Sequence, residues 1–421
     1  MGAPSLLLAG SVVGLAFTLN SLRPPRAPSW LATASFFAGW LTSELALHHV
    51  LWQCVLVGFL VYVGALATWI GKLGLLFAVT SWVLLCLSWR RGQATAVIVD
   101  GALDRALTEL PDGPLDEGDD VVTPARWRQL AFPFPVSHPA VERVRNVPFF
   151  EGDALELRLD VIRRRGVDHS ATAKRPALIY VHGGGWVIDH KTRQGLPLMQ
   201  RLASRGWVCF NIDYRLSPRA TFPDHIVDVK RAIAWVRDHA AEWGVDPDFI
   251  VIAGNSAGGH LASLAALTPN RPEFQPGFET ADTSLAACLS FYGIYDFTDR
   301  HGHWPHPGLS QLLERVVMKK RRADAPDDYA AASPFHWISP DAPPFLVVHG
   351  ERDTLVTVDE ARAFSEALAA TSQAPCAYFE IPGAQHAFEI FPSLRTVYLL
   401  RGLERFATYV HRQYLDARAA Q

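Results

Sequence analysis

Cysteine is scarce in this chain: there are five in 421 residues, and no two of them form a C-x-x-C pair. The spacing argues against a zinc site, and the odd number argues against a framework of disulfide bonds. Cys209, Cys288 and Cys376 each fall in a short apolar run, where a buried, unreactive thiol is the simplest interpretation. We therefore expect neither a metal nor another cofactor.

The chain also lacks a surplus of basic residues, because 39 Lys and Arg are set against 42 Asp and Glu, a formal net charge of -3. Proteins that bind nucleic acids need such a surplus or a basic stripe on one face. We therefore expect no nucleic acid partner. Internal repeats and low-complexity tracts are absent as well, and nothing in the sequence indicates an oligomeric state.

Charged residues are rare in the first ninety positions, where only Arg23, Arg26, Glu44, Lys72 and Arg90 occur. A helix needs about 20 apolar residues to cross the hydrocarbon layer of a membrane. A cleaved signal peptide is disfavoured, because the first apolar run lacks a basic start and other apolar runs follow it. Three uncharged runs, and a fourth that contains Glu44, predict three or four membrane helices over residues 5–20, 30–47, 50–71 and 73–88.

The orientation of these helices depends on their number. Two arginines follow the first run and two follow the last: Arg23, Arg26, Arg90 and Arg91. With three spans both pairs lie on one side of the membrane, and the positive-inside rule places that side, with the rest of the chain, in the cytoplasm. With four spans the pairs lie on opposite sides and the rule gives no orientation. We expect a multi-pass membrane protein whose remaining chain is cytoplasmic.

Short apolar runs alternate with helical segments after residue 145. Residues 146–150 and 155–162 predict a hairpin, and six continuous runs of the kind that helices cover on both faces follow at 177–181, 207–212, 249–253, 286–291, 345–348 and 377–381. This pattern predicts a doubly wound, mostly parallel α/β sheet. We expect a membrane anchor over 1–91, a linker and possible cap over 92–144, and the α/β domain over 145–421 with a cap insertion at about 292–334.

The segment Gly-Asn-Ser-Ala-Gly at 254–258 follows one of these strands and precedes a helical run. It has the G-x-S-x-G spacing of a nucleophile elbow, in which a sharp turn between strand and helix projects a serine. Glycines are needed because larger side chains beside the serine would collide. An ordinary glycine-rich turn is the alternative, which the flanking strand and helix disfavour. We expect an α/β-hydrolase fold with Ser256 as the nucleophile.

A second glycine-rich segment, His-Gly-Gly-Gly-Trp at 182–186, also follows a predicted strand. Consecutive glycines let backbone N–H groups approach a substrate oxygen closely, as an oxyanion hole requires, and HGGG is the form found in lipases and esterases. We expect the N–H groups of Gly183 and Gly184, with that of Ala257, to stabilise an oxyanion. His182 is expected to hold the loop.

A serine needs a base to activate it and an acid to orient that base. Asp353 and His386 each come shortly after one of the last two predicted strands. The chain order Ser, Asp, His and the positions at strand ends match the catalytic triad of this fold. We expect His386 to take the proton of Ser256 and Asp353 to orient the imidazole. Glu351 is the competing acid, because the fold accepts either carboxylate.

These segments together resemble the hormone-sensitive-lipase-like carboxylesterases, including membrane-anchored esterases of actinobacteria. The resemblance covers residues 175–390 and rests on motifs in the family's order: HGGGW at 182–186, Asp-Tyr-Arg-Leu-Ser-Pro at 213–218, Phe222-Pro223 with Asp228, and GNSAGG at 254–259. The chain departs from the family at Asn255, where an acidic residue is usual, which implies a tuned activity. HGGGW beside a membrane anchor is also similar to prenylcysteine methylesterases, and HGG-x-W to aryl-formamidases.

The resemblance implies hydrolysis of lipophilic carboxylic esters, of a small molecule or a lipid, through an acyl-enzyme. The alternatives are hydrolysis of amides, formamides or prenylcysteine methyl esters and, in another class, a non-catalytic ligand-binding protein. Trp186 and Phe388 are expected to line the acyl pocket, although aromatic residues near apolar strands are as readily core residues. The mobile cap of the family has two candidates here, residues 95–145 and 292–334.

Overall fold

The computed structural model describes residues 2–107, 124–134, 136–152, 155–167, 170 and 172–420. Part of the linker and possible cap expected over 92–144, and two residues between the strands of the expected hairpin, lie outside them. An eight-stranded sheet forms the centre, in the order β1-β2-β4-β3-β5-β6-β7-β8. β1 and β2 are antiparallel and the other six strands are parallel, which confirms the predicted sheet. The strands are β1 (Val141–Gly152), β2 (Leu155–Arg164), β3 (Arg175–Val181), β4 (Val208–Ile212), β5 (Val245–Asn255), β6 (Ala287–Phe291), β7 (Phe345–Gly350) and β8 (Cys376–Ile381).

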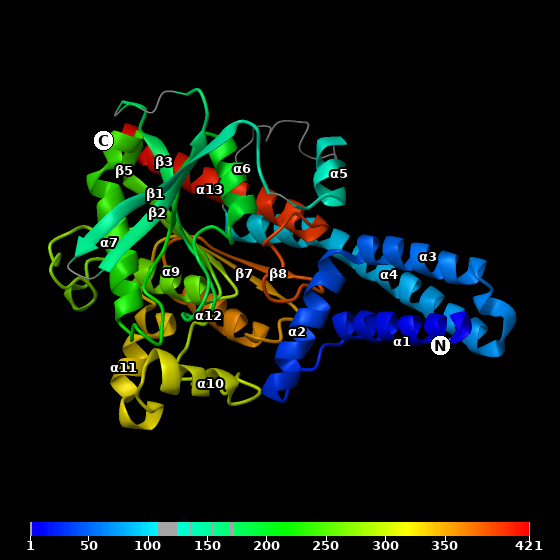
Figure 1. The fold of residues 1–421 in the computed structure, drawn as a ribbon. Helices are drawn as coiled ribbons and strands as arrows, with labels where there is room; N and C mark the ends of the chain where they lie inside the picture. The colour runs from blue at the N-terminus through cyan, green and yellow to red at the C-terminus, as the bar shows by residue number, and fades with distance from the viewer. Residues whose placement is uncertain are drawn as a thin grey trace.

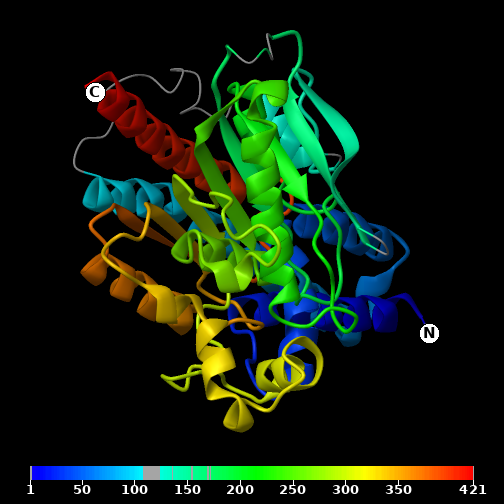
Figure 2. The same cartoon turned by 90° about the vertical axis from the view of Figure 1, so that its left-hand side faces the viewer.

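Helices cover both faces of this sheet. The covering helices are α4 (Trp69–Ala106), α6 (Leu196–Ser204), α7 (Asp224–Asp238), α9 (Ala257–Leu267), α12 (Val358–Thr371) and α13 (Leu394–Ala419), and short helices are α5 (Pro124–Ala131), α8 (Ala240–Trp243), α10 (Gly308–Leu312) and α11 (Pro326–Ala331). One apolar cluster joins the sheet to α7, α9 and α12, and a second joins it to α6, α13 and the end of α4 (Figures 1 and 2). Because the central strands are covered on both faces, their sequences are continuously apolar.

Three further helices precede α4: α1 (Ala3–Leu22), α2 (Ser29–Glu44) and α3 (Ala46–Tyr62). In Figure 1, α1, α3 and the first part of α4 extend together to one side of the sheet, and α2 lies between them and the sheet. α1 and α4 are long and apolar enough to cross a membrane, and α2 and α3 form a pair bent by 88° that passes the same test together. The described residues therefore hold two candidate spans, or three if the bent pair counts as one.

α1 and α4 pack at close range because small residues lie at their contact. A Cβ atom on Gly74 would lie 2.8 Å from the backbone nitrogen of Leu8, and the hydroxyl groups of Thr18 and Ser81 share a hydrogen bond of 2.8 Å. Small side chains and buried hydroxyl pairs are typical of helix contacts in membranes, where backbones approach closely. The contact between α1 and α4 therefore resembles that of paired membrane helices, which agrees with α1 and α4 being candidate spans.

α4 differs from the run expected at 73–88, because it continues without a break to Ala106. Its last turns place Val99, Ala102 and Leu103 in the apolar cluster of α13 and β8. The boundary expected at residue 91 therefore falls inside one helix, and residues 95–106 cover the sheet instead of forming a cap. Arg90 and Arg91 interrupt the hydropathy of the helix but not its helix propensity, so hydropathy ended the run too early.

A buried ion pair joins the amino-terminal helices to the α/β domain. Glu44, at the bend between α2 and α3, contacts Arg395 at 3.1 Å, and both side chains are almost fully buried. The second oxygen of Glu44 accepts the Ser393 hydroxyl at 2.8 Å, while Arg395 also donates to the carbonyl of Pro382 at 2.9 Å. The bend between α2 and α3 is therefore held against the start of α13 by buried polar groups that all have partners.

We predict that Glu44→Ala lowers the free energy of unfolding by about 3 kcal/mol, because Arg395 would remain buried without its carboxylate. The thermal unfolding midpoint of the detergent-solubilised protein measures this change. Asp324→Ala is the control, since it removes a partner of the exposed Arg321 and should cost less than about 1 kcal/mol. Equal midpoints for the two variants would contradict a structural role of the buried pair.

Candidate active site

Ser256 lies in the sharp turn between β5 and α9. Its backbone angles, φ 56° and ψ -122°, are rare for a residue with a side chain, and its N–H donates to the carbonyl of Phe291 at 2.9 Å. A Cβ on Gly254 would lie 2.3 Å from the carbonyl oxygen of Gly258, and one on Gly258 would lie 2.1 Å from that of Val181. Only glycines fit at these positions, and the turn has the geometry expected of a nucleophile elbow.

His386 and Asp353 are paired through their side chains. Nδ1 of His386 lies 2.6 Å from Oδ2 of Asp353, and both residues are buried. The other carboxylate oxygen accepts the N–H groups of Leu355 and Val356 at 2.8 and 2.9 Å. A second imidazole, that of His349, places Nε2 3.3 Å from Oδ2. Donors therefore surround the carboxylate.

These donors determine the charge of Asp353. Burial alone would raise the pKa of its carboxyl group, but the charges and hydrogen bonds of His386 and His349 outweigh burial and hold the pKa well below its usual range. A carboxyl group with a depressed pKa loses its contribution to stability only as the pH falls through that low value. Asp353 is therefore ionised at every pH near neutrality.

Glu351, the competing acid, is engaged elsewhere. Its carboxylate pairs with Arg91 at 2.7 Å and accepts the N–H of Gly383, also at 2.7 Å. Since the carboxylate beside His386 belongs to Asp353, the contacts favour Asp353 as the acid.

The glycine loop lies against Ser256, because a Cβ on Gly183 would stand 3.1 Å from that of the serine. The N–H of Gly183 donates to Oε1 of Gln194 at 2.7 Å, and the Gln194 amide donates to Asp189. This N–H is therefore already hydrogen-bonded to Gln194, whereas the sequence predicted that it would donate to an oxyanion. Gly184, with φ 108°, has no hydrogen-bond partner for its N–H among the described residues.

Ala257 is the first residue of α9, so its N–H has no acceptor within the helix. The amino-terminal end of a helix also favours a negative charge. His182 supports the neighbouring loop as expected: Nδ1 lies 2.8 Å from the Gly183 carbonyl, and the ring stacks on Tyr214 with 4.5 Å between centroids.

Trp186 and Phe388, both expected to line an acyl pocket, are enclosed in the core. Trp186 donates from Nε1 to His260 at 3.2 Å and packs edge-on against Phe297. Phe388 belongs to the buried cluster beneath β8 and α13. Strands and helices close over both rings, which leaves almost no surface of either for a substrate.

Two aromatic side chains that sequence analysis missed flank His386. The Tyr292 ring lies 4.4 Å from the imidazole between centroids, and Phe36 of α2 meets it edge-on at 6.1 Å. α2 is fixed there because the hydroxyl of Thr354 donates to the carbonyl of Ala32 at 3.0 Å. One feature of the sequence indicates that α2 is not an ordinary membrane span: the run at 30–47 contains polar residues, among them Glu44.

α10, in the insertion at 292–334, lies between the glycine loop and α2. A Cβ on Gly185 would lie 3.6 Å from Cδ2 of Leu312, and a Cβ on Gly308 would lie 3.0 Å from that of Ser29. The insertion therefore lies beside the site, where a cap is expected, and α2 forms the adjoining part.

A buried network lies behind the nucleophile. The Tyr292 hydroxyl contacts both oxygens of Glu389 at 2.5 Å and accepts from Nδ2 of Asn255 at 3.1 Å. Burial raises the pKa of Glu389 to about 7, against the opposing effect of the Tyr292 hydrogen bond. Asn255, the residue that departs from the family pattern, therefore connects the elbow to a carboxyl group that titrates near neutrality.

We predict that Glu389→Gln flattens the dependence of stability on pH between 5 and 8. The contribution of a carboxyl group whose folded pKa is raised is fully present below its unfolded pKa and is lost as the pH rises through about 7. Removing this titration should decrease the loss between pH 5 and pH 8 by up to about 3 kcal/mol. Unfolding midpoints at both pH values measure it, and Glu366→Gln, on the exposed side of α12, should behave like the wild type. An unchanged pH dependence in Glu389→Gln would refute this assignment.

Comparisons with known proteins agree with this geometry. The family model described as BD-FAE matches residues 167–368. The chain is 39% identical over 428 aligned residues to "Probable carboxylic ester hydrolase LipM" of Mycobacterium tuberculosis, which covers 98% of this chain and 96% of that protein. It is 44% identical over 273 residues to "Esterase LipQ" of the same organism, which covers 65% of this chain and 64% of LipQ.

Among solved structures, a butyrate-bound thermophilic esterase, Est2 of Thermogutta terrifontis, is similar with a TM-score of 0.54 and 27% identity, over 65% of this chain and 94% of that one. The likeness to LipM extends over nearly the whole chain, including the amino-terminal helices. The chain belongs to the family of hormone-sensitive-lipase-like carboxylic ester hydrolases.

Proposed function

We propose that this chain hydrolyses carboxylic esters with Ser256 as nucleophile, His386 as general base and Asp353 as the acid that orients the imidazole. The observation that carries the proposal is the 2.6 Å contact between His386 and an ionised Asp353, on loops that follow β8 and β7. Ser256 follows β5, and the carboxyl ends of parallel strands lie at one edge of a sheet. With Nδ1 bound to Asp353, Nε2 is the nitrogen left to accept the serine proton.

The reaction follows from these roles. The serine oxygen attacks the ester carbonyl as His386 takes its proton, and the imidazolium then gives that proton to the departing alcohol, which leaves an acyl-enzyme. Water, deprotonated by the same imidazole, releases the acid. The N–H groups of Gly184 and Ala257 would receive the oxyanion, and that of Gly183 would join them only after Gln194 moved away. One such donor is typically worth about 3 kcal/mol.

We predict that Ser256→Ala abolishes hydrolysis of p-nitrophenyl esters and that Asp353→Asn lowers kcat by about 10⁴-fold, because the imidazole loses its orienting charge. Glu351→Gln should keep most of the activity, since Glu351 does not contact His386. Steady-state rates of the purified full-length proteins measure these effects. Wild-type rates in Ser256→Ala, or a greater loss in Glu351→Gln than in Asp353→Asn, would contradict the assignment.

The wall formed by α2 supports a lipophilic substrate that enters from a membrane. Phe36 faces the imidazole, whereas the next residue, Phe37, is 64% exposed on the outside of the same helix. Phe36 is 8% exposed, so a long acyl chain beside it would bury the small apolar surface that remains. The inner side of α2 is therefore the acyl side of the proposed site.

The contacts of two arginines with Glu351 support one orientation of the chain in a membrane. Arg26 donates to the backbone carbonyl of Glu351 and Arg91 pairs with its carboxylate, so both arginine clusters lie at the end of the bundle that meets the α/β domain. This is the arrangement expected for three spans. Under the positive-inside rule it favours a cytoplasmic catalytic domain.

We predict that Phe36→Ala raises KM for p-nitrophenyl decanoate about twofold, because the acyl chain loses the small apolar contact that Phe36 leaves exposed, and leaves KM for the acetate nearly unchanged. Phe37→Ala is the matched control on the same helix and should match the wild type for both esters. The comparison of the two esters separates acyl binding from damage to His386, which would lower kcat for both. Equal effects of the two substitutions would exclude α2 as the acyl wall.

A further inference from the structure

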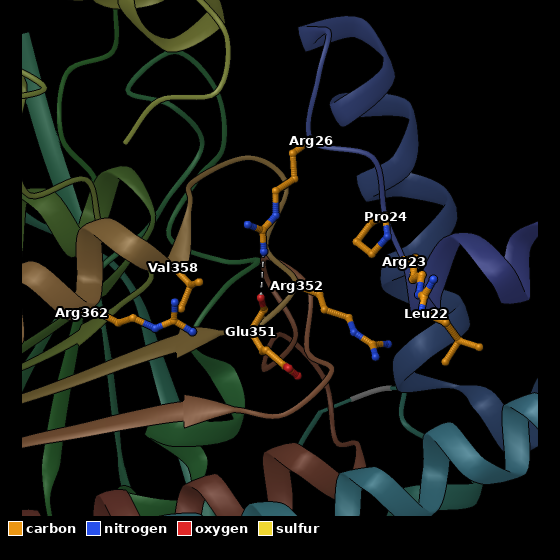
Figure 3. A pocket seen from close by; sticks show the side chains of 8 residues that line it. All are labelled: Leu22, Arg23, Pro24, Arg26, Glu351, Arg352, Val358 and Arg362. Atoms are coloured by element: carbon orange, nitrogen blue, oxygen red, sulfur yellow. Dashed lines mark hydrogen bonds between the residues drawn. The ribbon is translucent and has the colours of Figure 1, made fainter. Parts of the chain in front are cut away.

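A pocket of about 380 Å³ lies where the amino-terminal helices meet the ends of β7 and β8 (Figure 3). It is lined by Leu22, Arg23, Pro24 and Arg26 on one side and by Glu351, Arg352, Val358 and Arg362 on the other. Figure 3 shows Arg26 reaching from the link between α1 and α2 toward Glu351, with Arg352 beside it. The volume is within the range of small-molecule sites, and the catalytic mechanism uses none of these side chains.

Positive charge in this pocket exceeds its negative charge. The side chain of Arg23 has no hydrogen bond or ion pair with any described residue; only its backbone N–H is bonded, to the carbonyl of Leu19. Among the described residues, the guanidinium groups of Arg26 and Arg352 donate to backbone carbonyls alone, those of Glu351 at 3.3 Å and of Ser21 at 2.9 Å. Three guanidinium groups therefore line the pocket without a carboxylate partner among the described residues.

The remaining carboxylates near the pocket are already engaged. Glu351 pairs with Arg91 at 2.7 Å, and Arg362 contacts Glu380 at 2.8 Å and Asp359 at 2.7 Å. Burial lowers the pKa of Arg352, and the positive charges of Arg91 and other neighbouring arginines lower it further. The pocket accordingly has uncompensated positive charge, which a bound anion would neutralise.

The location of the pocket points to the source of that anion. Leu22 is the last residue of α1, a candidate membrane span, and Arg23 follows it directly. Arginines at the end of a span lie at the level of the lipid headgroups. Guanidinium groups bind phosphate oxygens, like carboxylate oxygens, with two parallel hydrogen bonds. At the level of the headgroups, the phosphate of an anionic lipid is the anion that the bilayer supplies.

We propose that this pocket binds a phosphate group, carried by the headgroup of an anionic membrane lipid, between Arg23, Arg26 and Arg352. The same chemistry would accept free inorganic phosphate, which reaches the pocket from water instead of from the bilayer. The site is separate from the proposed esterase site and does not depend on ester hydrolysis.

An occupied pocket would contact the loop that carries Asp353 and, through Glu351, would be connected to the loop that carries His386. Arg352 is adjacent to Asp353 in the chain, and Glu351 accepts the N–H of Gly383, three residues before His386. A bound phosphate would neutralise the arginines on the link between α1 and α2 and hold that link against the two loops. Binding therefore connects the bilayer surface to the edge of the sheet that carries the acid and the base.

Lipid binding to the full-length chain tests this proposal. The protein carries Ser256→Ala so that no lipid is hydrolysed, and native mass spectrometry in detergent compares phosphatidylglycerol with phosphatidylcholine of the same acyl chains. We expect tighter binding of phosphatidylglycerol, and a loss of about tenfold or more in its affinity in Arg23→Gln with Arg26→Gln. The double variant Arg23→Lys with Arg26→Lys should retain most of the preference.

The matched control removes the same charge elsewhere. Lys320→Gln with Arg321→Gln lies in the basic run at 319–322, where both side chains are paired with aspartates, and should leave phosphatidylglycerol binding unchanged. Thermal unfolding midpoints show whether each variant is folded, and only folded variants are compared. Equal phosphatidylglycerol affinity in the wild type and in Arg23→Gln with Arg26→Gln would overturn the proposal.

Inorganic phosphate distinguishes the two sources of the anion. If millimolar phosphate binds through Arg23 and Arg26 while the two lipids bind equally, the pocket takes a soluble phosphate, and the lipid headgroup is overturned as the ligand. If phosphatidylglycerol is preferred and millimolar phosphate displaces it only weakly, the headgroup is supported. Ester hydrolysis, measured separately with Ser256 intact, can fail without affecting either result.

Discussion

The carboxylate of Asp353 is the group on which the geometry of the active site depends. It is fully buried, and it remains charged only because two imidazoles and two backbone N–H groups point at it. A buried carboxylate without such donors would take up a proton. Its charge fixes the tautomer and orientation of His386, so the loops after β7 and β8 must keep their relative positions. The backbone of the 350–356 loop is therefore as important to the proposed chemistry as the side chains.

The amino-terminal helices are part of this arrangement and not merely a tether. α2 touches both loops, through Thr354 and through Phe36 beside His386, and the bend after it is tied to α13 by Glu44 and Arg395. α4 then continues from the amino-terminal bundle into the layer that covers the sheet. A displacement of the bundle relative to the sheet would consequently disturb the catalytic loops. Under the proposed function, this coupling would place the entry point of a lipophilic ester next to the catalytic side chains.

The sequence predicted the α/β domain well, because its signals are local. Each continuous apolar run became a strand of the sheet, and all but that of the edge strand β8 are buried on both faces. The turn at Ser256 needs glycines at fixed positions whatever the surroundings. The sequence favoured Asp353 over Glu351 as the acid that orients His386. The contacts of Glu351 with Arg91 and Gly383 support that preference, because they engage its carboxylate elsewhere. These features depend on backbone geometry and on chain order, both of which are visible in a single sequence.

What the sequence did not reveal depends on tertiary contacts. Hydropathy cannot distinguish a span from a helix that packs on an enzyme, so the helix at 30–47 was predicted while its packing against the site, and the extent of α4, were missed. Gln194, which occupies the N–H of Gly183, lies outside any motif, and Trp186 and Phe388 are core residues because other elements close over them. Site-specific labelling tests the central claim most directly: peptide mapping after a fluorophosphonate reaction should find the adduct on Ser256, formed far more slowly in His386→Ala. An adduct on another residue, or labelling of Ser256 that does not depend on His386, would contradict the account.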